Sequence, residues 1–236
     1  MANPVLNEKV LDRVQDYSAT EKMTIDGTVN KTGLLILLTI VGAVIGWNSP
    51  SPMLMIMFLI ATLVLVFMIS RKPERAAVMS QPYALMEGMI LGAISSFYSA
   101  VYPGIVSNAL MLTLSCLAIM LGLYKFKIIR VTERFKSVLM AATMAIGVTY
   151  LISMIMGFFG THLPMIHESS PVGIAFSVIV VGVAAFNLLL DFDLIEQAYQ
   201  RGSPKYMEWY GGFALLVTLV WLYLEILRLL SKLNKK

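Results

Sequence analysis

Residues 53–70 read MLMIMFLIATLVLVFMIS and contain no charged side chain. An α-helix of this length rises about 27 Å, close to the ~30 Å hydrocarbon core of a bilayer, so this stretch is predicted to span a membrane. The composition supports this interpretation, because 58% of the 236 residues are hydrophobic and only 14% are charged. About a quarter of the residues in a soluble domain are charged. The chain is therefore predicted to be an integral membrane protein embedded in a lipid bilayer.

Six further apolar segments contain no Lys or Arg, which predicts an all-α integral membrane protein with seven transmembrane helices. The predicted spans are residues 32–47, 53–70, 83–101, 104–124, 137–159, 172–190 and 206–227. The first span is short, so its helix is expected to begin before Lys31. Turns that contain Pro, Gly or Ser separate neighbouring spans at residues 48–52, 102–104 and 169–171.

The basic residues fall on alternate loops, which predicts the orientation of the chain. Four Lys and Arg residues precede the first span, and further groups follow the second, fourth and sixth spans. The intervening loops have none. By the positive-inside rule, the N-terminus and the loops after spans two, four and six are predicted to be cytoplasmic. Because the first 31 residues are polar, no cleavable signal peptide is expected and the first span serves as the insertion signal.

The C-terminal tail does not follow this alternation. Seven full crossings would place Arg228, Lys232, Lys235 and Lys236 on the outer side. Either the earlier loops determine the topology, which we favour, or the last apolar segment re-enters and leaves on the cytoplasmic side. The predicted organisation is a cytoplasmic N-terminal segment at residues 1–31, a seven-helix domain at 32–230 and a basic tail at 231–236.

Two GxxxG patterns occur in the spans, Gly42 with Gly46 in span one and Gly88 with Gly92 in span three. Glycines at this spacing allow helix backbones to approach closely. We interpret them as sites of intramolecular packing, with dimerisation as the alternative.

Four carboxylic residues lie deep enough in the spans to be costly, namely Glu87, Asp191, Asp193 and Glu225. A charged side chain at the bilayer centre costs at least ~2.5 kcal/mol, so these residues are candidates for function. The predicted orientation brings Glu87, Asp191 and Arg71 to a similar depth at the cytoplasmic side. Burial favours the neutral form of a carboxyl group, whereas a nearby arginine favours its charged form. A group balanced between these effects is predicted to act as a pH-gated latch.

Two simpler explanations remain open for these carboxylates. Asp191 and Asp193 could be wetted at the membrane boundary, with no switching role. Glu225 could form an i,i+3 ion pair with Arg228 on the last helix.

Other functional classes are disfavoured. The basic residues flank apolar segments, so no nucleic-acid partner is expected. The single cysteine, Cys116, lies within an apolar span and is interpreted as a small packed residue. His162 and His167 lack the spacing of a catalytic zinc site. No enzyme and no cofactor are predicted, and metal ligands cannot be assigned from these patterns.

Seven segments, in this order and spacing, resemble the Bax inhibitor-1 family, specifically its prokaryotic branch with the YccA-like proteins. They are NPVL at 3–6, YALMEG at 83–88, YPGIV at 102–106, VTERF at 131–135, LDFDLIE at 190–196, PKYMEWY at 204–210 and VWLYLEILRLL at 220–230. The resemblance implies a seven-helix fold with the last helix surrounded by the other six, placed in the cell (inner) membrane.

The resemblance also implies a pH-sensing pair of aspartates on helices six and seven, with an arginine at the end of helix two. Asp191 matches the first aspartate and Arg71 matches the arginine. The second aspartate aligns with Thr218, which cannot ionise, whereas a rival register aligns it with Glu225 but leaves too little helix afterwards. The two-carboxylate sensor is therefore expected to be incomplete.

Two functions follow from the resemblance. The first is a pH-sensitive calcium leak channel or transporter, with the calcium ion as its substrate. The second is a non-conducting regulator that binds a membrane partner such as a membrane-anchored AAA protease. The carboxylates within the spans favour conduction, and the missing aspartate at Thr218 favours regulation.

Overall fold

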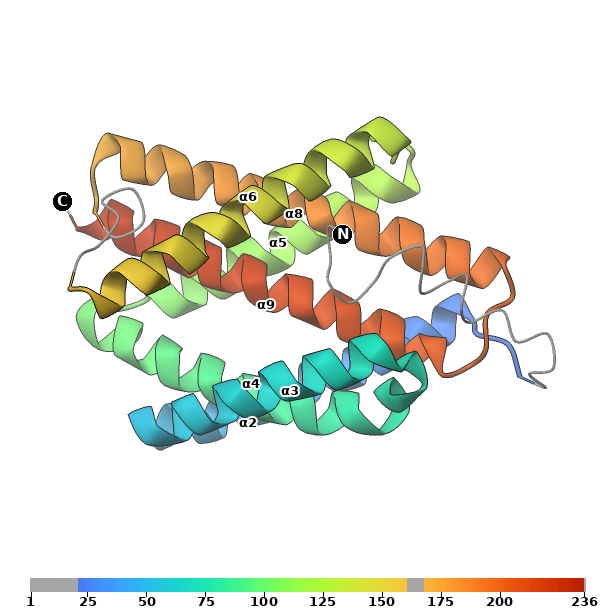
Figure 1. Cartoon of the computed structure of the whole chain (residues 1–236), viewed down its shortest axis with the longest axis horizontal. Coiled ribbons are helices and arrows are strands. Elements are labelled where there is room, and N and C mark those ends of the chain that lie inside the picture. Colours follow the sequence, from blue (N-terminus) through green and yellow to red (C-terminus); the bar gives the residue numbers. More distant parts are fainter. Residues whose placement is uncertain (1–20, 161–167, 236) are drawn as a thin grey trace. The chain divides into compact units, whose positions relative to one another are not determined.

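The computed structural model describes residues 21–160 and 168–235. The elements are α2 (Ile25–Asn48), α3 (Pro52–Arg71), η1 (Pro73–Arg75), α4 (Ala76–Val101), α5 (Ile105–Lys125), α6 (Glu133–Phe158), α8 (Pro171–Gln200) and α9 (Met207–Asn234). Seven of these helices are long and apolar enough to cross a membrane, which confirms the predicted all-α fold class (Figure 1). His162 and His167 lie outside the described residues.

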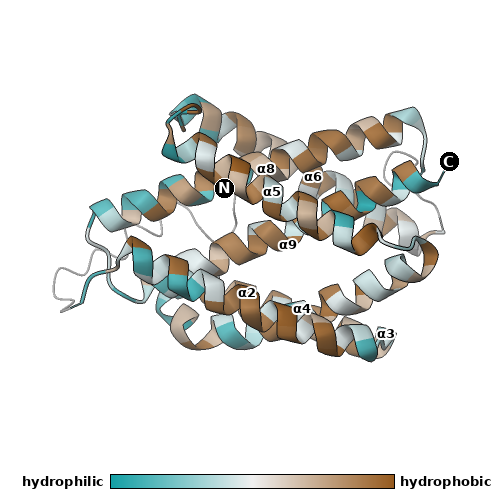
Figure 2. Ribbon diagram, turned by 180° about the vertical axis from the view of Figure 1, so that it is seen from behind, coloured by the Kyte–Doolittle hydropathy of each residue, from teal (hydrophilic) through white to brown (hydrophobic). Residues whose placement is uncertain are grey.

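Local sequence explains where several helices begin. Thr24 and Thr132 cap α2 and α6, because their hydroxyl groups accept hydrogen bonds from the backbone N–H groups of Gly27 and Phe135. Gly104 has φ +80 in the three-residue turn between α4 and α5, a conformation that glycine adopts without strain. Figure 2 shows hydrophobic residues along the helices and hydrophilic residues gathered near their ends.

Several helices extend beyond the apolar segments that predict them. α2 begins at Ile25, before Lys31 as expected, and before the predicted limit at residue 32. α4 begins at Ala76 and continues through Pro82, and α9 continues past residue 230 to Asn234. Hydropathy marks only the lipid-crossing part of a helix, so charged turns at its ends are not detected. α9 is one unbroken helix of 28 residues, long enough to cross a membrane, and the side on which the C-terminal tail lies stays a prediction.

The described residues form two compact units. One unit contains residues 21–101 and 191–217, and the other contains residues 102–160, 168–190 and 218–235. α8 and α9 contribute to both units. The most apolar window of α9 is 61% buried, compared with 11–44% in the other six spans, so the last helix supplies the largest share of the core.

In the first unit, α2 packs closely along α4. A Cβ atom on Gly42 would meet the Leu85 carbonyl oxygen, and one on Gly88 would meet the Thr39 carbonyl oxygen. Gly46 and Gly92 make equivalent close approaches to the opposite backbone. Both GxxxG patterns therefore serve intramolecular helix packing, as predicted.

Candidate functional site

Asp191 lies on α8 and has no solvent-exposed surface. It directly follows three buried leucines, Leu188, Leu189 and Leu190. The Asp191 side chain thus offers no surface to solvent, whereas Asp193 is half-buried, and a switching role for either residue stays a prediction. A carboxyl group in such surroundings is costly when charged, so this position is the strongest candidate among the predicted site residues.

The residues predicted to act with Asp191 occupy varied environments. Arg71 ends α3, is exposed, and places its guanidinium carbon 4.7 Å from the centre of the Phe67 ring. Asp193 is half-buried and accepts a hydrogen bond of 2.6 Å from the side-chain amide of Gln197. The structure thus gives both residues a neighbour on their own helix, and the pairing of Arg71 with Asp191 stays a prediction.

Glu87 is half-buried on α4, within hydrogen-bonding reach of the Thr62 hydroxyl group on α3. Thr62 itself is buried, with 3% of its surface exposed. One turn before Glu87, Tyr83 packs edge-on against Phe213 of α9, with ring centres 4.8 Å apart. Glu87 therefore lies where α3 and α4 meet, next to a contact with α9.

In the other unit, the buried carboxylate of Glu225 forms a polar cluster with Tyr150 and Arg228, which are half-buried. The Tyr150 hydroxyl group on α6 donates to both carboxylate oxygens of Glu225, at 2.9 Å each. Arg228 donates to the same oxygens at 3.0 and 3.1 Å, and to the Tyr150 oxygen at 2.5 Å. The predicted i,i+3 pair is thus present, but it is part of a cluster that also joins α6 to α9. Thr218, two turns earlier on α9, is buried with 4% of its surface exposed.

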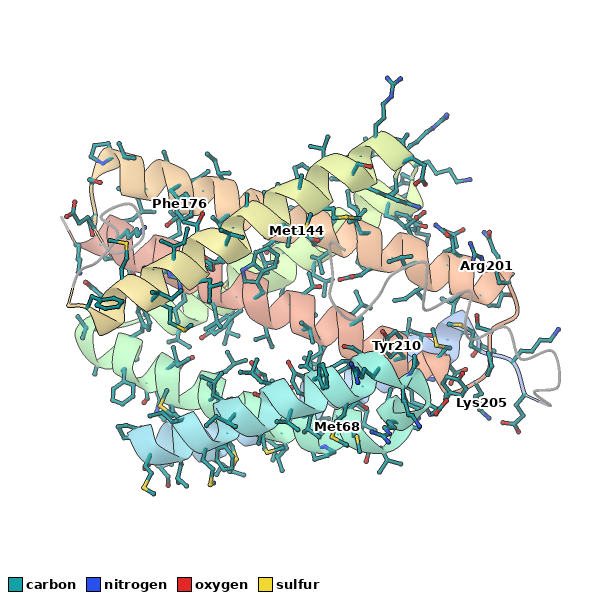
Figure 3. The ribbon with its side chains drawn as sticks, in the orientation of Figure 1. Met68, Met144, Phe176, Arg201, Lys205 and Tyr210 are labelled. Carbon is teal, nitrogen blue, oxygen red and sulfur yellow. The ribbon has the colours of Figure 1, made fainter. Side chains whose placement is uncertain are left out.

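Other contacts link α6, α8 and α9 within the same unit. Phe176 of α8 packs edge-on against Tyr150, with ring centres 6.4 Å apart (Figure 3). The Lys232 ammonium group is buried and donates to the Gly173 carbonyl oxygen at 2.9 Å. The Asn187 amide donates to the Thr143 hydroxyl oxygen at 3.0 Å. Polar side chains therefore connect α6, α8 and α9 within this unit.

The sequence reasoning did not identify Tyr150 or Lys232. Tyrosine counts as hydrophobic in a hydropathy scan, so Tyr150 is hidden within span five, and Lys232 was assigned to the basic tail. A search for every hydroxyl and amide within the apolar spans would have found Tyr150, Asn187 and Thr143.

Glu208 is a third buried carboxylate, after Asp191 and Glu225, and the sequence reasoning did not single it out. Glu208 lies in the first turn of α9. Its Oε1 atom accepts two hydrogen bonds from Thr24, one from the backbone N–H at 2.9 Å and one from the side-chain hydroxyl group at 3.0 Å. A Cβ atom on Gly27 would collide with this carboxyl group. The negative charge therefore lies at the N-terminus of α2, where the helix dipole favours it.

Backbone hydrogen bonds hold the segment before α2 against the loop between α8 and α9. The Met23 N–H donates to the Ser203 carbonyl at 2.8 Å, and the Lys205 N–H donates to the Glu21 carbonyl at 3.1 Å. The Lys205 ammonium group also lies 2.6 Å from the Glu21 carboxylate (Lys205 is labelled in Figure 3). This hydrogen bond and charge lower the pKa of Glu21 and raise the pKa of Lys205.

Among the described residues, no three His, Cys, Asp or Glu side chains come together in a group that could hold a metal ion. The candidate carboxylates are spread over several helices, with Glu87 on α4, Asp191 and Asp193 on α8, and Glu225 on α9. This arrangement differs from the multi-carboxylate cage of a high-affinity calcium site.

The fold and these buried carboxylates define a multi-pass membrane protein with seven spanning helices. A family model described as Bax inhibitor 1 like matches residues 3–235, and the chain belongs to this family. The predicted resemblance is thereby confirmed over nearly the whole chain. No curated protein matched the chain.

Proposed function

We propose that this protein is a pH-sensitive calcium leak channel or transporter, and that the protonation state of Asp191 controls the flux. The observation that carries the proposal is the complete burial of Asp191 on a membrane-spanning helix. Ionisable groups inside membrane spans are rare, costly and associated with ion or proton pathways. Membership of the Bax inhibitor 1 like family supports the same conclusion.

In this proposal, charged Asp191 is stabilised by Arg71, and protonation releases that arginine and alters the packing of α8. We place the protein in the cell (inner) membrane with its N-terminus in the cytoplasm, on the basis of the alternating basic loops. Asp191 then lies towards the cytoplasmic end of α8. Calcium is the substrate, and it passes through without a tight resident site.

Calcium flux from reconstituted vesicles tests the proposal. Purified protein is incorporated into vesicles loaded with a calcium indicator, and flux is followed from about pH 6 to about pH 8, where a perturbed carboxyl group can titrate. We expect protein-dependent flux that changes with pH. Protein-free vesicles are the control. Flux equal to that control at every pH, from vesicles that hold folded protein, contradicts the proposal.

The second candidate is a non-conducting regulator that binds a membrane-anchored AAA protease. Thr218 favours it, because this buried position cannot ionise although the resemblance implies an aspartate there. Co-reconstitution with such a protease separates the two functions. Inhibition of proteolysis together with absent calcium flux would favour regulation.

A further inference from the structure

Residues 125–136, called here the α5–α6 turn, include the last residue of α5 and the first turn of α6, and they concentrate positive charge. The α5–α6 turn carries the five cations Lys125, Lys127, Arg130, Arg134 and Lys136. Its single acidic residue, Glu133, lies 3.0 Å from the Lys136 ammonium group. The net charge of this turn is therefore +4, equal to that of the whole chain. Figure 3 shows nitrogen-tipped side chains that project outward from this turn.

Two large apolar side chains stand exposed among these cations. Phe126 is 75% exposed and Ile128 is 67% exposed. Both belong to the hydrogen-bonded end of α5, where their N–H groups donate to the carbonyls of Gly122 and Leu123. The backbone is thus well ordered, while the side chains face away from the protein. Alternating basic and apolar side chains are typical of segments that bind a lipid surface.

Lys127 adopts a backbone conformation that favours glycine. Its φ is 54, and among the described residues it is the one non-glycine residue with a positive φ. The Lys127 N–H donates to the Tyr124 carbonyl and the Ile128 N–H to the Leu123 carbonyl, the pattern of a helix end in which glycine is usual at this position. A lysine at this position therefore lowers the stability of the protein when no ligand is bound.

The first turn of α6 also carries a cation in an unfavourable place. Arg134 lies at the end of the helix where the dipole disfavours positive charge, whereas Lys136 is offset by its ion pair with Glu133, the residue directly after the Thr132 cap. The positive φ of Lys127 and the cation at the start of α6 are independent features. Each places positive charge in the α5–α6 turn at a cost in stability, and a bound anion would offset this cost.

We propose that residues 125–136 bind anionic phospholipid headgroups, with Phe126 and Ile128 inserted at the boundary between headgroups and acyl chains. Lipid is the occupant that matches both features, because it offers phosphate charge beside apolar chains. This inference is independent of whether the protein conducts calcium. The turn between α3 and α4 differs, since its Arg71 stacks on Phe67 and Glu74 lies between its other cations.

Each cation near an anionic surface strengthens binding about fivefold. We therefore compare wild type with a double variant, Lys127→Gly with Arg130→Gln, in the full-length protein. Glycine suits the backbone at residue 127, so this variant keeps the helix end. Lys72→Gln with Arg75→Gln is the matched control in the other basic turn.

Native mass spectrometry of protein titrated with phosphatidylglycerol, and with phosphatidylcholine of the same chains, provides the readout. We expect preferential binding of phosphatidylglycerol, about 25-fold weaker binding in the double variant, and little change in the control. Lys127→Arg with Arg130→Lys should retain the affinity, and glycerol phosphate without acyl chains should not compete.

Equal affinity of wild type and the double variant would overturn the proposal. An equal loss in the control would do so as well, because it would reduce the effect to overall charge. Competition by glycerol phosphate would assign the turn to free phosphate esters and likewise overturn the lipid assignment.

Discussion

The Tyr150 hydroxyl group on α6 donates to both carboxylate oxygens of Glu225 on α9, across 75 residues of sequence. Glu225 is buried, with 2% of its surface exposed, and Tyr150 and Arg228 donate the hydrogen bonds that its carboxylate oxygens accept. Removing one donor from a buried carboxylate leaves desolvation that is no longer compensated. This contact is therefore expected to contribute strongly to the packing of α6 against α9.

Tyr150→Phe should lower the free energy of unfolding by ~1–3 kcal/mol, because the Glu225 carboxylate loses its hydroxyl donor. Unfolding in mixed micelles, followed by circular dichroism, measures the change. Tyr199→Phe is the matched control, since Tyr199 is 48% exposed. An equal effect of the two substitutions would show that the buried contact contributes nothing specific.

Gly42→Ala should destabilise the protein by ~1–3 kcal/mol, because the new Cβ atom would press on the α4 backbone at Leu85. Gly33→Ala on the same helix is the control, since a Cβ atom there meets nothing within 4 Å. That substitution should be neutral or stabilise the helix by up to ~1 kcal/mol. The same unfolding assay applies, and a harmless Gly42→Ala would argue against tight packing of α2 on α4.

The contact between Glu21 and Lys205 should depend on pH. Lys205 lowers the pKa of Glu21 in the folded protein. The contribution of Glu21 to stability is therefore present above its unfolded pKa of about 4.3, and it is lost as the pH falls through the lower pKa of the folded protein. Glu21 raises the pKa of Lys205, so the contribution of Lys205 is lost only as the pH rises above about 10.4. Hydrogen-exchange protection of the Met23 amide, which bonds Ser203, reports the contact.

In wild type, this protection should decrease in acid, whereas Glu21→Gln should already have low protection at neutral pH. High salt should weaken protection in wild type only, because both side chains are solvent-exposed. A wild-type pH profile identical to that of Glu21→Gln would contradict the assigned role.

The spans were predictable because each is a long apolar segment, and the close packing of Gly42 on α4 was predictable from its spacing. The ends of the helices were harder to predict. α8 continues ten residues beyond its apolar segment to Gln200. The backbone hydrogen bonds of an α-helix are made within the helix, so polar side chains such as Asp191 and Asp193 do not end it.

The partners of the buried charges could not be predicted from local sequence. Tyr150 meets Glu225 through tertiary packing, which no spacing rule describes. Glu208 was not singled out from the sequence, because its partner Thr24, at the start of α2, lies 184 residues away. The pattern of a single sequence shows where charged side chains lie within apolar spans. The hydrogen-bond partners that stabilise those charges depend on which helices pack together.

Thr218→Asp and Glu225→Gln distinguish the origins of the pH response. If conduction needs a second carboxylate near Asp191, wild type has a single titrating site and should respond shallowly to pH, and Thr218→Asp should steepen the response and move its midpoint upward through repulsion between like charges. If Glu225 replaces the missing group, Glu225→Gln should flatten the response and Thr218→Asp should do little. Calcium flux against pH measures both, and unchanged profiles in both variants would show that neither Glu225 nor a carboxyl group at position 218 takes part in the pH response.

The most direct test of the proposed function is calcium flux from vesicles containing Asp191→Asn, compared with wild type from about pH 6 to about pH 8. Asparagine mimics the permanently protonated carboxyl group, so flux through Asp191→Asn should lose most of its dependence on pH. Asp193→Asn is the matched control, because Asp193 is half-buried and hydrogen-bonded to Gln197, and it should change the wild-type profile only weakly. Identical pH profiles for wild type and Asp191→Asn would contradict the account.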